Sequence, residues 1–212
     1  MRTNSAGRWC VGAIVAVTAA QVSVGLPVAD GEPCPDVEVV FARGTTEPPG
    51  VGGIGQAFVD SLRSKAGGRT VSVYAVDYPA SNDFSTSTPA GGADASAHVE
   101  SMASACPGTR MVLGGYSQGA AVVDLATTSM PQSVADHVAA AAVFGSPRSS
   151  FADALSPGPL PSIGRLYTAK TIEMCVPNDP ICYQGGWDWQ AHGAYIQTGM
   201  VDEAAAFAAS RL

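Results

Sequence analysis

The sequence has little positive charge. Lys65 and Lys170 are its only lysines, and the 212 residues carry a formal net charge of −7. Domains that bind nucleic acids present a stripe or patch of basic residues, and no such stripe occurs here. Nucleic acid is therefore not an expected partner. The acidic balance would not draw the chain to an anionic lipid surface either, so any transient contact with lipid would have to be apolar.

Long hydrophobic runs are missing too. The apolar stretch Trp9–Ala20 is shorter than the run of about 20 residues that a membrane-spanning helix needs. It follows the basic residues Arg2 and Arg8 and precedes small residues where a signal peptidase can cut, which is typical of a secretory signal. Residues 1–33 are therefore predicted to be a signal peptide, cleaved near residues 25–31, and a short mature segment. An uncleaved amphipathic anchor is the alternative.

Residues 34–212 are predicted to form one secreted, extracellular domain. Their length suits a single domain, and hydrophobic residues make up 46% of the chain, which is enough to bury a sizeable core. Nothing in the pattern suggests a second domain or an internal repeat, and a monomer is expected.

Cysteine is scarce, and its spacing excludes some chemistry. Cys10 lies inside the predicted signal, so four cysteines remain in the mature chain: Cys34, Cys106, Cys175 and Cys182. An even number in a secreted chain predicts two disulfides, with three possible connectivities. There is no C-x-x-C pair and no nearby pair of histidines, so neither a zinc site nor a thiol-redox site is expected.

The most informative motif is Gly115-Tyr116-Ser117-Gln118-Gly119, between an apolar strand-like run and an Ala-rich helix-like run. A G-x-S-x-G motif in this setting is a nucleophile elbow, in which the serine sits on a sharp turn at the end of a sheet. Glycines two positions to either side leave room for the neighbouring backbone. The motif alone is a weak signal in a chain with 24 glycines, where a glycine-rich turn with an incidental serine is the alternative. The flanking runs favour Ser117 as a nucleophile.

Strand-like and helix-like runs alternate along the mature chain. Strands are predicted at Val37–Ala42, Thr70–Val76, Met111–Gly115, Val138–Phe144 and, more weakly, Thr171–Cys175. Helices are predicted around Ile54, Phe58 and Leu62, after a cap at Asp94, and over Asp202–Leu212. Loops are predicted at Ser85–Gly92 and Ser146–Ser162, which are rich in Pro, Gly and Ser. This alternation predicts an α/β fold with a parallel sheet between two helical layers.

In such a sheet, ligands bind beyond the carboxyl ends of the strands, where the strand order reverses. The first predicted strand ends in the segment 41–47, and the third ends in the serine elbow. If these strands are neighbours, the two loops face each other across a cleft. Cys34 and Cys106 each precede one of these strands, so a bridge between them would tie the opposite edge of the sheet together.

A nucleophilic serine needs a base, and the chain has three histidines. His137 directly precedes a predicted strand, which places it at the wrong edge of the sheet. His98 lies in a helix-like run and is interpreted as a surface or packing residue. His192 follows the last predicted strand, in a loop at the correct edge, and matches the order serine, acid, histidine of this fold.

The acid should lie between Ser117 and His192 in the sequence. Asp179 lies in a proline-containing turn between Cys175 and Cys182, which a disulfide would clamp. The alternative is that Asp179 only makes an Asx turn before Pro180. Among the other aspartates, Asp124 falls within a helix, Asp188 lies only four residues before His192, and Asp77 precedes the serine. Order and rigidity favour Asp179.

Four blocks of the mature chain resemble the cutinase family, specifically the secreted bacterial cutinase-like esterases. The blocks are Phe-Ala-Arg-Gly-Thr-Thr-Glu at 41–47, Gly-Gly-Tyr-Ser-Gln-Gly at 114–119, Asn-Asp-Pro-Ile-Cys at 178–182 and Gln-Ala-His-Gly-Ala-Tyr at 190–195. The resemblance implies an α/β-hydrolase of the cutinase type, with a central five-stranded parallel sheet and no large lid. It implies Ser117 as nucleophile, His192 as base and Asp179 as the acid that orients it.

The resemblance also implies the disulfides Cys34–Cys106 and Cys175–Cys182. It implies an oxyanion hole built from the backbone N–H groups of Thr45 and Gln118, and no metal or organic cofactor. The Trp187 loop differs from the apolar loop of fungal members, which leaves the substrate open.

Apolar side chains near the expected cleft are predicted to bind substrate: Phe84, Tyr116, Ile181, Tyr183, Trp187 and Trp189. They would form a shallow, open rim that fits short to medium acyl chains. The alternative for both tryptophans is that they pack inward as core, since large aromatic side chains strongly drive burial.

The function predicted from the sequence is a serine esterase that hydrolyses carboxylic esters, either a cutin-like polyester or short- to medium-chain lipid esters. A secreted phospholipase or triacylglycerol lipase would use the same three residues on other esters and is the main alternative. A peptidase is less favoured. A non-catalytic binding protein is disfavoured because serine, acid and histidine are all present.

Overall fold

The computed structural model describes Met1, residues 33–156, Leu160 and residues 162–212. The predicted signal peptide and its cleavage region near residues 25–31 lie outside the described residues. The description below concerns residues 34–212, which form one compact unit.

A parallel sheet of five strands forms the centre of this unit, as predicted. The strands are β1 (Val37–Ala42), β2 (Val71–Ala75), β3 (Arg110–Tyr116), β4 (Val138–Phe144) and β5 (Thr171–Met174). Their order across the sheet is β2-β1-β3-β4-β5. Each predicted strand is present, within two residues of its predicted ends.

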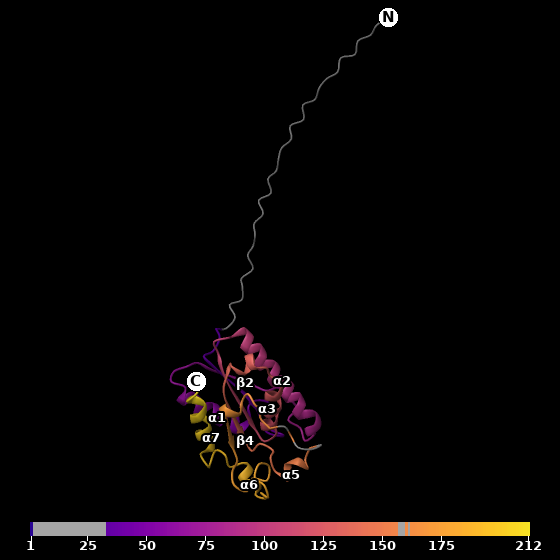
Figure 1. Ribbon diagram of the computed structural model, residues 1–212, viewed down its shortest axis with the longest axis vertical. Helices are drawn as coiled ribbons and strands as arrows, with labels where there is room; N and C mark the ends of the chain where they lie inside the picture. Colours follow the sequence, from indigo (N-terminus) through magenta and orange to yellow (C-terminus); the bar gives the residue numbers. More distant parts are fainter. Residues whose placement is uncertain (2–32, 157–159, 161) are drawn as a thin grey trace. The chain divides into compact units, whose positions relative to one another are not determined.

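Helices cover both faces of the sheet. On one face α2 (Phe84–Ala105) packs against α3 (Gln118–Ser129), and on the other α1 (Gly52–Lys65) packs against α7 (Met200–Ala209), as Figure 1 shows. Shorter helical segments lie in the connections: α4 (Gln132–Ala135), α5 (Ser150–Asp153), η1 (Thr168–Lys170) and α6 (Trp189–His192). Within the described residues, no helix is both long and apolar enough to cross a membrane.

Each face of the sheet has its own hydrophobic core because successive side chains of a strand point to opposite faces. In β1, Val40 and Ala42 pack in the core beneath α2 and α3, whereas Val39 and Phe41 pack in the core beneath α1 and α7. A strand buried on both faces reads as a continuous apolar run, which explains the sequence pattern of β1.

The strand order places two loops side by side at the carboxyl edge of the sheet. The chain runs outward from β1 to β2 and then returns past β1 to β3, so the order reverses between β1 and β3. These two strands pair directly, with Ala42 opposite Gly115. The loop after β1 and the turn after β3 therefore flank the crevice in which ligands bind in open α/β sheets.

The stretch Ser85–Gly92 is helical, so the prediction of a loop there is wrong. It forms the first turns of α2, and Asp94 lies inside the helix, where its carboxylate accepts a hydrogen bond from the Tyr74 hydroxyl. A Cβ at Gly91 would lie only 2.7 Å from Val122 of α3. This glycine therefore serves the close packing of two helices, a tertiary effect that overrides its low helix propensity.

Two smaller predictions of loops also need correction. Ser146–Ser162 contains α5, which begins at Ser150 and is capped by Ser149, whose hydroxyl accepts a hydrogen bond from the Ala152 N–H. His192, predicted in a loop, is the last residue of α6. Both helices have four residues, too few for a hydrophobic period to show in the sequence.

Two disulfides join the four described cysteines. Cys34–Cys106 links the segment before β1 to the segment before β3, at the edge of the sheet opposite the crevice. Cys175–Cys182 closes the loop that follows β5. These are the pairings that the resemblance implies.

Candidate active site

Ser117 lies on a sharp turn between β3 and α3. Its backbone has φ 55° and ψ −118°, a conformation that L-residues rarely adopt and that costs about 1–3 kcal/mol. The flanking glycines make this turn possible. A Cβ at Gly115 would lie 2.2 Å from the carbonyl oxygen of Gly119, and a Cβ at Gly119 would lie 2.0 Å from that of Ala42. This is the geometry that the G-x-S-x-G motif predicts.

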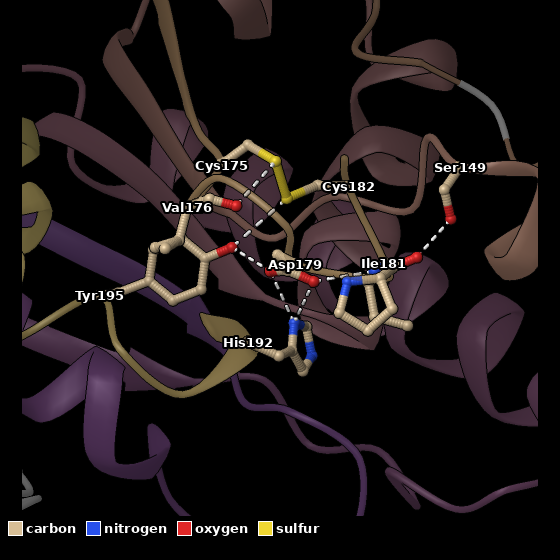
Figure 2. Close-up of a disulfide and its surroundings, with 9 residues drawn as sticks. Ser149, Cys175, Val176, Asp179, Ile181, Cys182, His192 and Tyr195 are labelled. Atoms are coloured by element: carbon tan, nitrogen blue, oxygen red, sulfur yellow. Dashed lines mark hydrogen bonds and ion pairs between the residues drawn. A yellow bond between two sulfur atoms is a disulfide. The ribbon is translucent and has the colours of Figure 1, made fainter. Parts of the chain in front are cut away.

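Three side chains form a continuous hydrogen-bonded chain at this edge of the sheet. Ser117 Oγ lies 2.9 Å from His192 Nε2, and His192 Nδ1 lies 2.8 and 2.9 Å from the two carboxylate oxygens of Asp179. Figure 2 shows the His192 ring facing that carboxylate. An ionised carboxylate only accepts hydrogen bonds, so Nδ1 carries the proton and Nε2 is free to accept one from Ser117. Such an arrangement can activate a serine hydroxyl as a nucleophile.

Asp179 is fully buried and nevertheless favours its ionised form. Burial raises the pKa of its carboxyl, but hydrogen bonds from His192 and Tyr195 and the attraction of His192 outweigh burial, so the pKa lies below its usual 3.8. The Ile181 N–H also donates to Oδ1, at 2.8 Å. The Asx turn considered from the sequence is thus present, and the same carboxylate makes it while contacting His192.

Tyr195 is a partner of Asp179 that sequence reasoning missed. Its hydroxyl donates a hydrogen bond to Asp179 Oδ2 and lies 3.5 Å from the Cys182 sulfur, so acid, tyrosine and disulfide pack together (Figure 2). Gly145 makes room for this cluster, because a Cβ there would lie 2.9 Å from the Tyr195 hydroxyl and 3.0 Å from His192 Cε1. The only signal in the sequence was the place of Tyr195 in the same block as His192.

Thr45 and Gln118, whose N–H groups are predicted to form an oxyanion hole, each line a cavity that Ser117 also lines. Thr45 lines the same cavity as Ser117 and His192. Gln118 is the first residue of α3, so its N–H has no partner within the helix. The buried side chain of Gln118 donates to the carbonyl oxygen of Ser81, at 3.1 Å.

A buried arginine and a glutamate hold the loop that carries Thr45. Arg43 donates from Nε to the carbonyl oxygen of Glu47, at 2.8 Å, and from a terminal nitrogen to that of Tyr78, at 2.7 Å. The Glu47 carboxylate accepts the N–H groups of Gly44, at 2.6 Å, and Gly53, at 2.8 Å. Both residues belong to the 41–47 block, but the sequence alone did not reveal this structural role.

Two cavities meet at Ser117. The larger has a volume of about 330 Å³ and reaches Thr45, Tyr116, Trp189 and His192. The smaller has a volume of about 30 Å³ and is lined mainly by apolar side chains. Phe84, Leu155 and Ile181 line both cavities.

Four of the six predicted substrate-binding residues line these cavities: Phe84, Tyr116, Ile181 and Trp189. Tyr183 and Trp187 do not, and their exposed fractions are 47% and 76%. Asp188 separates the two tryptophans and caps α6, where its carboxylate accepts a hydrogen bond from the Gln190 N–H. Neither tryptophan packs in the core. Leu155 was missed because its segment was interpreted as a loop.

The remaining candidate acids and bases lie elsewhere. Asp124 pairs with Arg148 at 2.8 Å. His98 pairs with Glu38 at 2.9 Å, and its ring stacks on the ring of Tyr74. Asp188 is occupied as the cap of α6. Within the described residues, no group of three or more His, Cys, Asp or Glu side chains is placed to hold a metal ion.

Comparison with known proteins gives a consistent result. The family model described as Cutinase matches residues 33–212. Carboxylesterase Culp1 of Mycobacterium tuberculosis is 55% identical over 205 residues, covering 95% of this chain and 94% of that protein. Phospholipase Culp4 of the same organism is 45% identical over 226 residues, covering 97% and 96%. A solved structure of Trichoderma reesei cutinase in complex with a phosphonate inhibitor is 34% identical, with a TM-score of 0.66, covering 84% of this chain and 77% of that one.

The fold, the hydrogen-bonded serine and these relatives define a class of protein, the carboxylic ester hydrolases of the α/β-hydrolase fold. Within that class, this chain belongs to the cutinase family.

Proposed function

We propose that this chain is a secreted serine esterase that hydrolyses carboxylic esters through Ser117, His192 and Asp179. The observation that carries the proposal is the unbroken chain of hydrogen bonds from the strained elbow serine to the buried carboxylate. The substrates proposed are a cutin-like polyester or lipid esters with short to medium acyl chains.

The proposed mechanism has two steps. His192, oriented by Asp179, takes the proton of Ser117 as its oxygen attacks the ester carbonyl, and then passes that proton to the departing alcohol. The backbone N–H groups of Thr45 and Gln118 stabilise the oxyanion, and each donor contributes about 3–4 kcal/mol in comparable enzymes. A water molecule, activated by His192, then releases the acid from the acyl-enzyme. No step of this mechanism uses a metal or an organic cofactor.

Secretion and domain limits are part of the proposal. The two disulfides are compatible with an oxidising compartment outside the cytosol. We infer that residues 1–33 hold the signal peptide and that residues 34–212 act as a single, monomeric domain. Sequencing the N-terminus of the exported protein tests the expected cleavage near residues 25–31.

A phospholipase is the second candidate, and the name of the relative Culp4 favours considering it. Both candidates use the same chemistry and differ in the ester that enters the cavities. The exposed Trp189 at the mouth of the larger cavity would support transient, apolar contact with a lipid or polyester surface in either case.

Parallel hydrolysis assays test the proposal. We expect Ser117-dependent cleavage of p-nitrophenyl esters, with a phospholipid and a polyester measured alongside to identify the preferred class. Ser117→Ala should remove about four to six decades of kcat on every substrate. Undiminished hydrolysis by Ser117→Ala would contradict the mechanism, and a rate on phospholipid far above that on the other esters would favour the second candidate.

A further inference from the structure

The carboxylate of Asp179 is held by a peptide group that is itself held from outside the Asp179 loop. The Ile181 N–H donates to Asp179 Oδ1, at 2.8 Å. The carbonyl group of the same peptide belongs to Pro180, and its oxygen accepts a hydrogen bond from the Ser149 hydroxyl. Figure 2 shows Ile181 between Ser149 and Asp179. Because a peptide group is planar, a contact that fixes its carbonyl oxygen also fixes the direction of its N–H.

The Ser149 side chain is fully committed to its two contacts. Only 1% of Ser149 is exposed, and its oxygen accepts the Ala152 N–H, at 3.1 Å. A serine hydroxyl has one hydrogen to donate, and the Pro180 oxygen receives it. Pro180 is buried too, so water does not easily replace this donor.

Backbone hydrogen bonds tie the segment that carries Ser149 to both the nucleophile and the acid. At the end of β4, the Phe144 carbonyl oxygen accepts the N–H of Ser117, at 2.8 Å. A few residues later, the N–H groups of Arg148 and Ser149 both donate to the Ile181 carbonyl oxygen, at 3.0 and 3.1 Å. This short segment therefore sets the spacing between the nucleophile turn and the Asp179 loop.

The Asp179 loop needs support of this kind. Asn178, directly before Asp179, has φ 68°, a left-handed backbone that persists only where surrounding contacts hold it. Hydrogen bonds in a chain also polarise one another. A donor on the Pro180 oxygen therefore strengthens the Ile181 N–H as a donor to Asp179.

We propose that Ser149 is a positioning residue of the active site. Its hydroxyl orients the Pro180–Ile181 peptide group, and this peptide group orients the Asp179 carboxylate toward His192. The inference rests on the proposed esterase function. Ser149 lines neither cavity at Ser117, so its removal should lower kcat and leave KM unchanged.

Two substitutions separate this role from the capping of α5. Ser149→Ala and Ser149→Gly both remove the donor to Pro180, but alanine is a poor helix cap whereas glycine is nearly as good as serine. We expect about a tenfold lower kcat in both variants, because a buried hydrogen bond that acts on a charged group is lost in each. The two variants should differ in stability and agree in kcat.

A spectroscopic readout reports on the acid directly. The ¹H resonance of His192 Nδ1–H, identified by its absence in His192→Ala, reflects the hydrogen bond to Asp179. It should move upfield in both Ser149 variants. Ser150→Ala is the matched control, because Ser150 is exposed and its hydroxyl contacts Gln184 of the same region, at 3.2 Å, rather than the Pro180 oxygen. This variant should keep the kcat and the resonance of the parent.

The outcomes are distinct. Parent-like kcat and resonance in the Ser149 variants would overturn the proposal, and so would a kcat loss in Ser149→Ala that Ser149→Gly does not share. A raised KM with unchanged kcat would also overturn it. Should one variant fail to fold, kcat and the resonance of the other decide. Hydrolysis that survives Ser117→Ala would instead contradict the proposed function itself.

Discussion

Asp124 and Asp179 are both fully buried aspartates, yet their pKa values move in opposite directions. Burial raises the pKa of Asp124 to about 6, because the nearby Arg148 only partly offsets it. Burial also raises the pKa of Asp179, but in that case hydrogen bonds reverse the effect and the pKa lies below 3.8.

The difference lies in the donors that each carboxylate meets. Asp179 accepts hydrogen bonds from His192, Tyr195 and the Ile181 N–H, so both of its oxygens have partners. Asp124 accepts one from Arg148 on Oδ2, and its Oδ1 has no hydrogen-bond partner in the described part of the chain. Burial alone thus does not decide whether a carboxylate can serve as a charged, orienting acid, whereas the number and placement of its donors do.

The largest expected difference between the two aspartates is in kcat, measured after each is replaced by asparagine. Asp179→Asn should lower kcat about 10,000-fold, because an amide favours the wrong tautomer of His192 and gives no charge to stabilise the imidazolium. Asp124→Asn should leave kcat near the parent value, since Asp124 does not contact the histidine. Steady-state kinetics on one soluble ester checks both. Similar losses in the two variants would break the distinction between them.

The second effect is on the free energy of unfolding. The contributions of Asp124 and Asp179 to it depend on pH in opposite directions. Native Asp124 has a pKa of about 6, above its unfolded value of 3.8, so the native state holds a proton that the unfolded state releases between these values. Its contribution to the free energy of unfolding therefore falls as the pH rises from about 4 to 6, by up to about 3 kcal/mol. Asp179 has the opposite sign, because its stabilising contribution is present above pH 3.8 and is lost as the pH falls below that value.

Denaturant unfolding of the parent and Asp124→Asn at several pH values measures the Asp124 contribution. The difference in unfolding free energy between the two proteins should change between pH 4 and 6 and be constant above that range. A difference independent of pH would show that Asp124 is ionised throughout this range.

The smallest of these effects concerns Tyr195. Tyr195→Phe removes one hydrogen bond to the charged Asp179, a contact of a kind that contributes about 1.5–3 kcal/mol. We expect about a tenfold lower kcat with an unchanged KM. The pKa of Asp179 should rise toward its usual value, so the loss of stability should be larger at pH 7 than at pH 3. Tyr183→Phe, at an exposed position outside both cavities, is the matched control. An unchanged kcat in Tyr195→Phe would show that His192 and Ile181 suffice to hold the acid.

What the sequence predicted correctly depends on local patterns. Strands such as β1 and the turn at Ser117 are read from neighbouring residues, because apolar runs and the two glycines specify them directly. His192 and Asp179 could be proposed because the order of residues along the chain and the edge of the sheet are both set by the α/β alternation.

What the sequence did not predict depends on contacts between distant segments. Gly91 and its neighbours look like a loop until α3 is seen to pack against them. Glu47 and Tyr195 acquire their roles from backbone N–H groups and a carboxylate that only the folded chain brings near. In the sequence, Asp124 was set aside because it falls within a predicted helix, whereas the physical difference between Asp124 and Asp179 lies in hydrogen-bond donors that no local pattern reports.

The most direct test is the rate at which a fluorophosphonate labels Ser117, followed by peptide mapping. The parent and Asp124→Asn should react at similar rates and carry the label on Ser117 alone, because both retain the hydrogen bonds from Ser117 through His192 to Asp179. Asp179→Asn should react slower by orders of magnitude. Labelling of another serine in the parent, or equal labelling rates in Asp179→Asn and the parent, would contradict the account.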